Sequence, residues 1–429
     1  MKNTNLFKLI KKLWPICRSI TGDGLKKSLI ILKSDLPISL QKNFKITSIK
    51  SGKKIYDWVI PKEWEINDAY IIYKKKKILD FKKNNLHVIN YSQPINKKKI
   101  KLNEIKQYLF TDKEKPNSIP YITSYYNEKT GMCIAYNDFK NLKNGYYDIL
   151  INSKFKKGHT YIAEYFKKGK IKDEIFFSTY LCHPSLANDN LTGPVIAIKI
   201  AEWISKEYRG GTKYSYRFVF GPETIGAIYN ISKNLNSLKK NVKYAFNLTC
   251  LAGSKKFSFL PSRNSNSITD KLAKNILKYE YKDYLSYSFL DRGSDERQYC
   301  NPNVDLPMVS IMKKKYHEYH QYHNSSDNLS FINNDQLLHS FELYKKIIIA
   351  IENNHIIKNN LICEPPLKKY FPELSKNKVQ GLSKTILDVL IFSDGKNSLL
   401  EIADKLNVSI LYLIPIVKKL REKKIISIK

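Results

Sequence analysis

The chain has 429 residues, enough for two to four domains at roughly 100–200 residues per domain. Hydrophobic residues make up 42% of it and aromatic residues 12%, so there is apolar material for folded cores, which excludes a disordered chain. The formal net charge of +35 comes almost entirely from lysine, because only seven of the 74 basic residues are arginine. This composition favours solvated lysine surfaces over a patch built for bidentate phosphate contacts, with a polyanion-binding surface as the alternative. A long-range field that favours anionic substrates follows in either case.

Neither an export signal nor a membrane span is expected. No stretch approaches about 18 uncharged apolar residues, and charges and a proline interrupt the apolar positions near the amino terminus. The six cysteines are scattered singly, without a CxxC pair, which is typical of a reducing compartment. We therefore expect a cytoplasmic protein without a disulfide framework.

The amino-terminal part of the chain predicts two helices followed by a small β domain. Apolar positions recur at helical spacing in residues 6–16 and 25–36, and a Thr-Gly-Asp-Gly turn at 21–24 separates them. After about residue 46, short segments of alternating polarity are separated by turns rich in Pro, Asn, Gly or Lys. We interpret residues 46–133 as an inserted antiparallel β domain.

Strands and helices alternate after about residue 146. Strands of the buried type are expected at 174–182, 216–221, 243–250 and 306–312, and helices at 191–208, 227–238, 268–281 and 333–356. This alternation predicts an α/β fold with a mostly parallel sheet flanked by helices. With the amino-terminal helices it forms a predicted main domain of residues 1–45 and 134–360.

The last segment, residues 361–429, predicts a winged-helix domain. It contains three short helical stretches, with turns at 394–395 and 407–409, and a β-prone tail. The part that follows the last turn is strongly basic, but it offers one Arg and no Asn or Gln to read base edges. A packing or protein-contact role is therefore favoured over nucleic-acid binding.

Two polar side chains follow the first strand of the predicted α/β sheet. His183 lies just past this strand, and Asp189 lies at the start of the next helix. Ligands of open α/β sheets bind outside the carboxyl ends of the strands, and an imidazole and a carboxylate on one tight loop can converge on a cation. A strand-end His and an Asp that caps the helix are the alternative.

Later strands are followed by side chains of the same kind. Glu223 comes directly after the strand at 216–221, where a general base would lie, with a solvated first-turn Glu as the alternative. Three of the eight His lie within seven residues after the last predicted strand: His317, His320 and His323. Such a cluster also arises as simple loop polarity. Because all these side chains follow strands of one sheet, we expect them to converge on one site.

Five segments of the chain, taken in order, carry a family resemblance: STYLCHPSLANDNLTGP (178–194), FGPETIG (220–226), FNLTC (246–250), DRGSDERQY (291–299) and HQYHNSSDNL (320–329). They resemble the zinc aminopeptidase and glutamate-carboxypeptidase-like clan. Three further segments, LWPICRSITGDGL (13–25), YDWVIPKEW (56–64) and IPYITSYY (119–126), make the similarity closer. The whole chain resembles uncharacterised bacterial proteins with an aminopeptidase-like domain, an inserted β domain and a carboxyl-terminal winged helix.

The resemblance implies a metal centre and a catalytic group. His183, Asp189 and His323 fall on metal-ligand positions of the clan, and Glu223 falls on the position of its general base. Two imidazoles and one carboxylate are the ligand count of a catalytic zinc that keeps an open position for water.

The chain departs from the clan at three positions. Thr224 and Thr249 stand where the di-zinc enzymes carry carboxylate ligands, and each lost carboxylate belongs to a different metal site. We therefore expect one zinc per chain. Ser185 stands where the clan carries an Asp that orients the first His, so the support of His183 is expected to come from elsewhere.

Other residues near these motifs are candidates for supporting roles. Asp295 falls near a segment that lines the substrate cleft of the clan, and we expect Asp295 and Arg292 to bind substrate or orient a ligand, with a loop ion pair as the alternative. His317 and His320 are reserve metal-ligand candidates. For the two Trp of the segment 57–64 we expect core packing, with a substrate-facing lid as the alternative.

Residues and resemblance together predict a zinc-dependent hydrolase of an amide bond, in which Glu223 moves a proton from water to the leaving amine. A peptide and an N-acylated sugar are both candidate substrates, and the resemblance links the sugar to surface-polysaccharide biosynthesis. The alternative is a non-catalytic regulator that binds a metal or metabolite and uses its winged helix to contact nucleic acid or protein. Homo-oligomer formation stays open.

Overall fold

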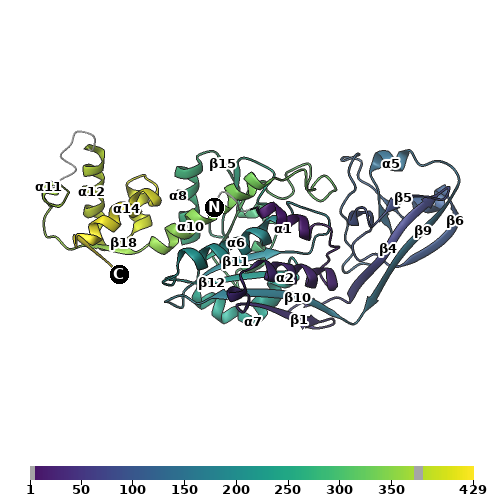
Figure 1. The fold of residues 1–429 in the computed structure, drawn as a ribbon, viewed down its shortest axis with the longest axis horizontal. Coiled ribbons are helices and arrows are strands. Elements are labelled where there is room, and N and C mark those ends of the chain that lie inside the picture. The colour runs from purple at the N-terminus through teal and green to yellow at the C-terminus, as the bar shows by residue number, and fades with distance from the viewer. Residues whose placement is uncertain (1–4, 372–379) are drawn as a thin grey trace. The chain divides into compact units, whose positions relative to one another are not determined.

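The computed structural model describes residues 5–371 and 380–429 (Figure 1). The chain divides into two compact units, Met1–Asn264 with Leu285–Phe341 and Ser265–Tyr284 with Glu342–Lys429. None of the described helices is long and apolar enough to cross a membrane.

The first unit is built on an eight-stranded sheet with the order β1-β10-β12-β11-β13-β16-β14-β15. The strands are β1 (Phe44–Lys50), β10 (His159–Lys167), β12 (Ser215–Gly221), β11 (Glu174–Tyr180), β13 (Val242–Asn247), β16 (Met308–Met312), β14 (Phe257–Leu260) and β15 (Tyr284–Ser286). The four central strands, from β12 to β16, run parallel, whereas β1, β10 and β14 pair antiparallel with their neighbours. The predicted α/β fold is confirmed. The site described below lies at the carboxyl ends of these four parallel strands.

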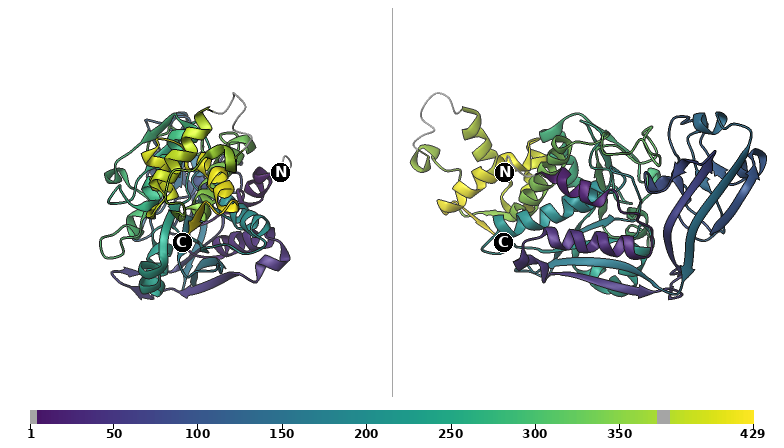
Figure 2. Two further views of the ribbon diagram at one scale, coloured as in Figure 1. Left: turned by 90° about the vertical axis from the view of Figure 1, so that its left-hand side faces the viewer. Right: turned by 45° about the vertical axis from the view of Figure 1, so that its right-hand side comes forward.

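Helices cover both faces of this sheet. One face carries α1 (Leu6–Leu13), α2 (Asp23–Asp35) and α6 (Thr192–Glu207), and the other carries α7 (Ile225–Asn241) and the short α9 (Glu296–Tyr299). Figures 1 and 2 show α2 and α6 on one side of the strands and α7 on the other. A short helix, α3 (Ile38–Gln41), precedes β1, and a 3-10 turn, η3 (Phe289–Asp291), precedes α9.

The central strand β11 is buried along its whole length, which explains why its sequence is continuously apolar. Successive side chains point to opposite faces. Phe176 contacts Tyr299 of α9, with ring centroids 5.0 Å apart, while Phe177 stacks between Phe218 and Phe246. Each face of the strand therefore has its own aromatic core.

The inserted β domain is a four-stranded antiparallel sheet with the order β5-β4-β9-β6, visible at one end of this unit in Figure 2. Its strands are β4 (Glu63–Tyr73), β5 (Lys76–Asp80), β6 (Ile95–Lys101) and β9 (Tyr146–Lys156). Smaller elements complete it: η1 (Asn85–His87), α4 (Leu102–Lys106), β7 (Leu109–Phe110), β8 (Met132–Cys133) and α5 (Tyr136–Lys140). The hairpin of β2 (Lys54–Ile55) and β3 (Trp58–Val59) instead packs on α7, with Ile55 in the same core as Ile225.

The strands of this small sheet do not span the same residues as the insert expected at 46–133. β1 belongs to the large sheet because it pairs with β10 along its whole length. β9 lies beyond residue 133 but pairs with β4 and β6 of the small sheet, and a two-residue turn then leads into β10. We propose that the domain limits lie at these strands, since a domain boundary falls where few contacts cross it.

The second unit contains the carboxyl-terminal helices. It comprises α8 (Ile268–Ile276), a π-helical turn (Leu277–Tyr281), the later part of α10 (Asn334–Asn353), α11 (Leu367–Tyr370), α12 (Gln380–Phe392), α13 (Leu399–Lys405) and α14 (Ile410–Glu422). Three short strands form an antiparallel sheet in the order β18-β17-β19: β17 (Ile356–Asn359), β18 (Asp394–Ser398) and β19 (Ile426–Ile428). Three helices with a small β wing are the architecture of a winged helix, as predicted.

Helix α8 is tied to this winged helix by one side chain. The amide nitrogen of Asn275 donates to the Asp404 side chain (2.9 Å) and to the Val408 carbonyl (3.1 Å), and its oxygen accepts from the Ile410 backbone (2.9 Å). Asn275 thereby satisfies polar groups at the turn between α13 and α14. The second unit consequently takes in residues that the sequence assigned to the main domain.

Candidate metal centre

The predicted site residues gather at the carboxyl edge of the parallel strands. His183 follows β11, Glu223 follows β12, Thr249 follows β13, and His323 lies in the long loop after β16. Asp189 precedes α6 on the loop that His183 begins. The sequence predicted this convergence because parallel strands bring their carboxyl ends to one edge of the sheet.

Three of these side chains form a cluster that fits a metal. The ligand atoms of His183, Asp189 and His323 all lie within 4.8 Å of one another, and Nε2 of His323 is 3.1 Å from Oδ2 of Asp189. This Oδ2 atom is buried and makes no hydrogen bond of acceptable geometry. A buried carboxylate oxygen without a hydrogen bond is costly, and two imidazoles with a carboxylate are a donor set that zinc prefers. The residues present therefore fit the expected metal.

The carboxylate of Asp189 is held in its charged form. Burial by itself would raise its pKa, but His183 and His323 oppose this effect, and the Tyr180 hydroxyl donates a hydrogen bond to Oδ1, so the pKa falls to about 2. The hydroxyl of Tyr180 also lies 2.8 Å from Oγ1 of Thr249. One oxygen of Asp189 is therefore satisfied within the protein, and the other faces the two imidazoles.

His183 is neutral and anchored from two sides. Burial lowers the pKa of its imidazole to about 4, so at neutral pH the ring is in the form that binds metals. Its Nδ1 lies 3.4 Å from Sγ of Cys182, and its carbonyl accepts two hydrogen bonds from the buried guanidinium of Arg18 (3.1 and 2.8 Å). These contacts supply the support that Ser185 does not give, because Oγ of Ser185 instead accepts from the Asn85 backbone (3.2 Å).

Asp327 fixes the backbone of the loop that carries Asp189. Its two carboxylate oxygens accept from the amides of Asn188 (2.7 Å) and Asp189 (2.9 Å), and its carbonyl accepts from the amide of Ala187 (2.9 Å). Burial raises the pKa of Asp327 to about 7, against the pull of these amides. The loop that carries Asp189 is thus held by the segment that carries His323.

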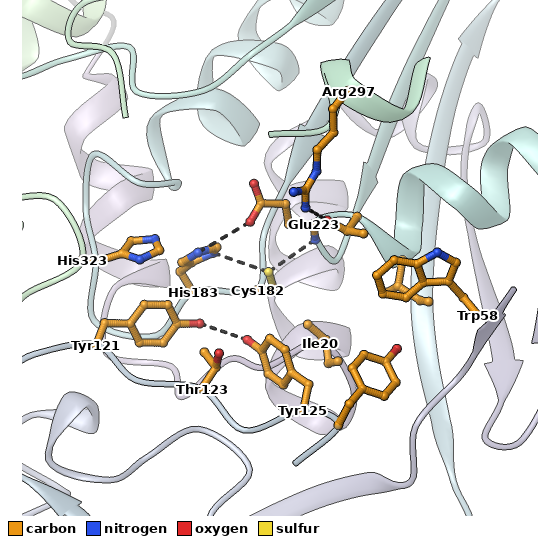
Figure 3. A pocket seen from close by; sticks show the side chains of 13 residues that line it. Ile20, Trp58, Tyr121, Thr123, Tyr125, Cys182, His183, Glu223, Arg297 and His323 are labelled. Carbon is orange, nitrogen blue, oxygen red and sulfur yellow. Dashed lines mark hydrogen bonds and ion pairs between the residues drawn. The ribbon is translucent and has the colours of Figure 1, made fainter. Parts of the chain in front are cut away.

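Glu223 stands at the mouth of this cluster. Its Oε2 lies 3.8 Å from Nε2 of His183, and its Oε1 accepts from the Ser294 hydroxyl (2.9 Å). Burial raises its pKa, and the charges of Asp295 and Asp189 act in the same direction. Glu223, His183 and His323 line one cavity of about 300 Å³, shown in Figure 3. Glu223 thus lies beside the cluster of His183, Asp189 and His323, faces the open cavity and has a raised pKa. This is the position of a general base.

The other expected residues lie outside this cavity wall. Asp295 is buried and accepts from the Thr224 amide (2.7 Å), so it shapes the turn after β12. Arg292 is exposed, with its guanidinium 5.2 Å from the centroid of the Phe289 ring. His317 and His320 are exposed and do not belong to the metal cluster.

The sequence did not identify the residues that close the cavity. Arg297 lines it in place of Arg292, and three aromatic residues of the insert line it as well: Tyr121, Tyr125 and Tyr126. Trp58 also lines it and is 37% exposed, contrary to the expected core packing, whereas Trp64 is buried as expected. The high density of aromatic residues in 119–126 was the one sequence signal for this part of the cavity wall. A long loop has no periodicity, so the sequence pattern could not place these side chains in the cavity.

Hydrogen bonds join the insert directly to the loop after β16, which carries His323. The Tyr121 amide donates to the His323 carbonyl (2.9 Å), and the Tyr121 ring lies 5.0 Å from the His183 ring and 5.1 Å from the His323 ring between centroids. Ile119 and Ser325 exchange two more hydrogen bonds. The insert is thus part of the site and not a separate appendage.

This fold, with its ligand cluster at the carboxyl edge of the sheet, is the fold of the zinc aminopeptidases. The structure matches BSAP, a zinc aminopeptidase from Bacillus subtilis, with a TM-score of 0.54 and 14% identity over 81% of this chain and 94% of that one. A peptidase M28 precursor from Shewanella amazonensis matches with a TM-score of 0.55 and 11% identity over 85% of this chain and 96% of that one.

The chain belongs to the family described as Domain of unknown function (DUF4910), which matches residues 7–354, and a winged helix-turn-helix family matches residues 355–428. It is 40% identical over 408 residues, 93% of this chain and 91% of the other, to a Clostridium acetobutylicum protein provisionally described as a polysaccharide biosynthesis protein with an aminopeptidase-like domain. A crystal structure from Clostridium acetobutylicum, provisionally described as a peptidase, matches with a TM-score of 0.91 and 38% identity over 99% of this chain and 96% of that one. The predicted family resemblance is confirmed.

Removal of the buried charge at Asp295 is expected to change how stability depends on pH. Burial raises the pKa of Asp295 to about 7, so the folded state binds a proton more tightly than the unfolded state, and stability falls as the pH rises from about 4 to about 7. We expect Asp295→Asn to be more stable than the native protein by about 1–3 kcal/mol at pH 8 and equal to it near pH 4. Urea unfolding of both proteins at several pH values measures this. A constant difference across that range would contradict it.

Proposed function

We propose that this protein is a mononuclear zinc-dependent hydrolase that cleaves an amide bond. The observation that carries the proposal is Oδ2 of Asp189, which is buried without a hydrogen bond and faces Nε2 of His323 at 3.1 Å. A cation bound there would stabilise this oxygen, and the two imidazoles beside it complete the ligand set of a catalytic site. A zinc ion held there supplies Lewis acidity to the scissile carbonyl and to a water molecule.

Glu223 carries the proton in this reaction. Its Oε2 lies on the cavity side of the cluster, 3.8 Å from Nε2 of His183, and Ser294 holds the other oxygen. From this position the carboxylate takes a proton from the attacking water and returns it to the leaving nitrogen. The C–N bond breaks, the hydroxyl is added to the acyl carbon, and the products are an acid and an amine.

A single zinc per chain is proposed because neutral groups stand where further carboxylate ligands would be needed. Oγ1 of Thr224 accepts from Arg297 (2.6 Å), and Oγ1 of Thr249 lies 2.8 Å from the Tyr180 hydroxyl. Tyr180 in turn donates to Oδ1 of Asp189, which leaves Oδ2 as the oxygen available to a metal.

The substrate proposed is a peptide or an N-acylated sugar, in a cytoplasmic role. The provisional description of the Clostridium acetobutylicum relative as a polysaccharide biosynthesis protein favours the sugar. Nucleic acid is not a proposed partner, because α14 offers Arg421 and no Asn or Gln for base contacts.

Metal content tests the centre directly. Protein purified without chelator is expected to hold about one zinc per chain, and His183→Ala, Asp189→Ala and His323→Ala are each expected to lose most of it, because each removes one of three protein ligands. His317→Ala and His320→Ala are the matched controls and should keep the metal. Elemental analysis by mass spectrometry gives the ratio. Zinc retained by the three ligand variants, or lost in the two controls, would refute the assignment.

Glu223→Gln separates catalysis from metal binding. The amide cannot take up the proton of water, so we expect turnover of an N-acylated sugar or peptide amide to fall by about 10²–10⁴-fold while zinc content is unchanged. Single-turnover assays on metal-counted protein measure this. Turnover that survives the substitution would exclude Glu223 as the base. Zinc-loaded native protein without turnover that binds DNA in a salt-dependent way would favour the regulator instead.

A further inference from the structure

The wall of the cavity carries an exposed cation, Arg297, beside the turn that carries Glu223. Arg297 is exposed and lines the cavity, and its Nη2 donates to Oγ1 of Thr224 (2.6 Å). Among the residues that the structure describes, no carboxylate lies within ion-pair distance of Arg297, although its charge acts at longer range on Glu223 and Asp295. A guanidinium has five N–H donors in a planar fork, so most of them stay available to a ligand. Figure 3 shows this side chain directed toward the turn that carries Glu223.

This cation changes what the cavity can bind. An enzyme that trims peptide amino termini has to accommodate the free amino group of its substrate, and carboxylates stabilise the protonated form of that group. Thr224 stands where the resembling enzymes carry a metal-ligand carboxylate, so this turn presents a neutral hydroxyl, which accepts a hydrogen bond from the Arg297 guanidinium. Of the described cavity-lining residues, Glu223 alone is acidic. The end of the cavity at Arg297 therefore suits a carboxylate or a phosphate better than a free amine.

An aromatic wall lies across the cavity from the metal cluster. Trp58 and Tyr126 are 37% and 55% exposed, with ring centroids 5.9 Å apart and planes inclined by 69°. The Tyr126 hydroxyl donates to the Val59 carbonyl (3.2 Å), which links the loop of Tyr126 to the hairpin of Trp58. Figure 3 places Trp58 on the opposite side of the cavity from His323. Exposed aromatic faces pack against the C–H faces of sugar rings, and the amphipathic indole suits a ligand that is partly polar.

We infer that the cavity selects an anionic N-acylated sugar, with a carboxylate or phosphate bound by Arg297 and the sugar ring packed on Trp58 and Tyr126. The inference rests on the proposed function, because the acyl amide of this sugar is the bond that is cleaved. Arg297 is a specificity-determining residue in this account. It takes no part in the proton transfer that Glu223 performs.

Ligand binding to zinc-loaded Glu223→Gln protein tests the inference without turnover. Four probes are compared by calorimetry: N-acetylmuramic acid as the carboxylate, N-acetylglucosamine 6-phosphate as the phosphate, neutral N-acetylglucosamine, and leucinamide as a free amine. We expect at least one anionic probe to bind about tenfold or more tightly than the neutral sugar, and leucinamide to bind most weakly. The two anionic probes distinguish a carboxylate substrate from a phosphate one.

Variants then assign the preference to residues. In the same background, Arg297→Gln is expected to reduce anion binding to the level of the neutral sugar, and Arg297→Lys to restore part of it, because lysine keeps the charge but loses the fork. Arg209→Gln removes one charge at an exposed position outside the cavity and should change nothing. Trp58→Ala is expected to weaken the anionic and neutral sugars by a similar factor.

The outcomes separate this inference from the proposed function. Protein that holds about one zinc but binds leucinamide best, or whose anion preference survives Arg297→Gln, overturns the inference and leaves the metal hydrolase standing. Protein that binds no zinc overturns the proposed function, whichever probe it prefers. If Trp58→Ala leaves sugar binding unchanged, the sugar ring does not pack on Trp58, and that part of the inference is wrong.

Discussion

The charge of Asp189 is the constraint on which the arrangement of the site depends. A carboxylate that is 1% exposed at the edge of the sheet must be held and compensated. Asp327 holds its backbone, Tyr180 satisfies one oxygen, and the imidazoles of His183 and His323 face the other. The strand ends, the loop after β16 and the loop that precedes α6 are therefore all required for one small cluster.

The same constraint explains why distant parts of the chain meet at the site. Arg18, from the amino-terminal segment, binds the carbonyl of His183, and Tyr121, from the insert, binds the carbonyl of His323. Both contacts fix main-chain atoms of the proposed metal ligands. Because the insert holds the His323 loop and also contributes Trp58 to the cavity wall, it would couple the geometry of the proposed metal centre to substrate selection.

The sequence predicted the parts of the site that follow from regular structure. Strand, turn and helix patterns placed His183, Asp189 and Glu223 at one edge, because parallel strands share the direction of their carboxyl ends. The choice between Arg292 and Arg297 could not be predicted, since it depends on a turn in which Thr224 has a positive φ of 64° and Asp295 holds the Thr224 amide. The antiparallel edge strands and the cavity-lining loop of the insert depend on long-range pairing that local pattern does not encode.

X-ray absorption at the zinc edge, on protein saturated with zinc and then freed of unbound metal, tests the single zinc held by His183, Asp189 and His323. We expect nitrogen and oxygen neighbours at about 2.0–2.2 Å with imidazole outer-shell scattering, no sulfur neighbour and no second metal nearby. A sulfur neighbour at about 2.3 Å would bring Cys182 into the shell, and a zinc–zinc distance of about 3.5–4 Å would show a dinuclear centre. Either result would contradict a single zinc held by His183, Asp189 and His323.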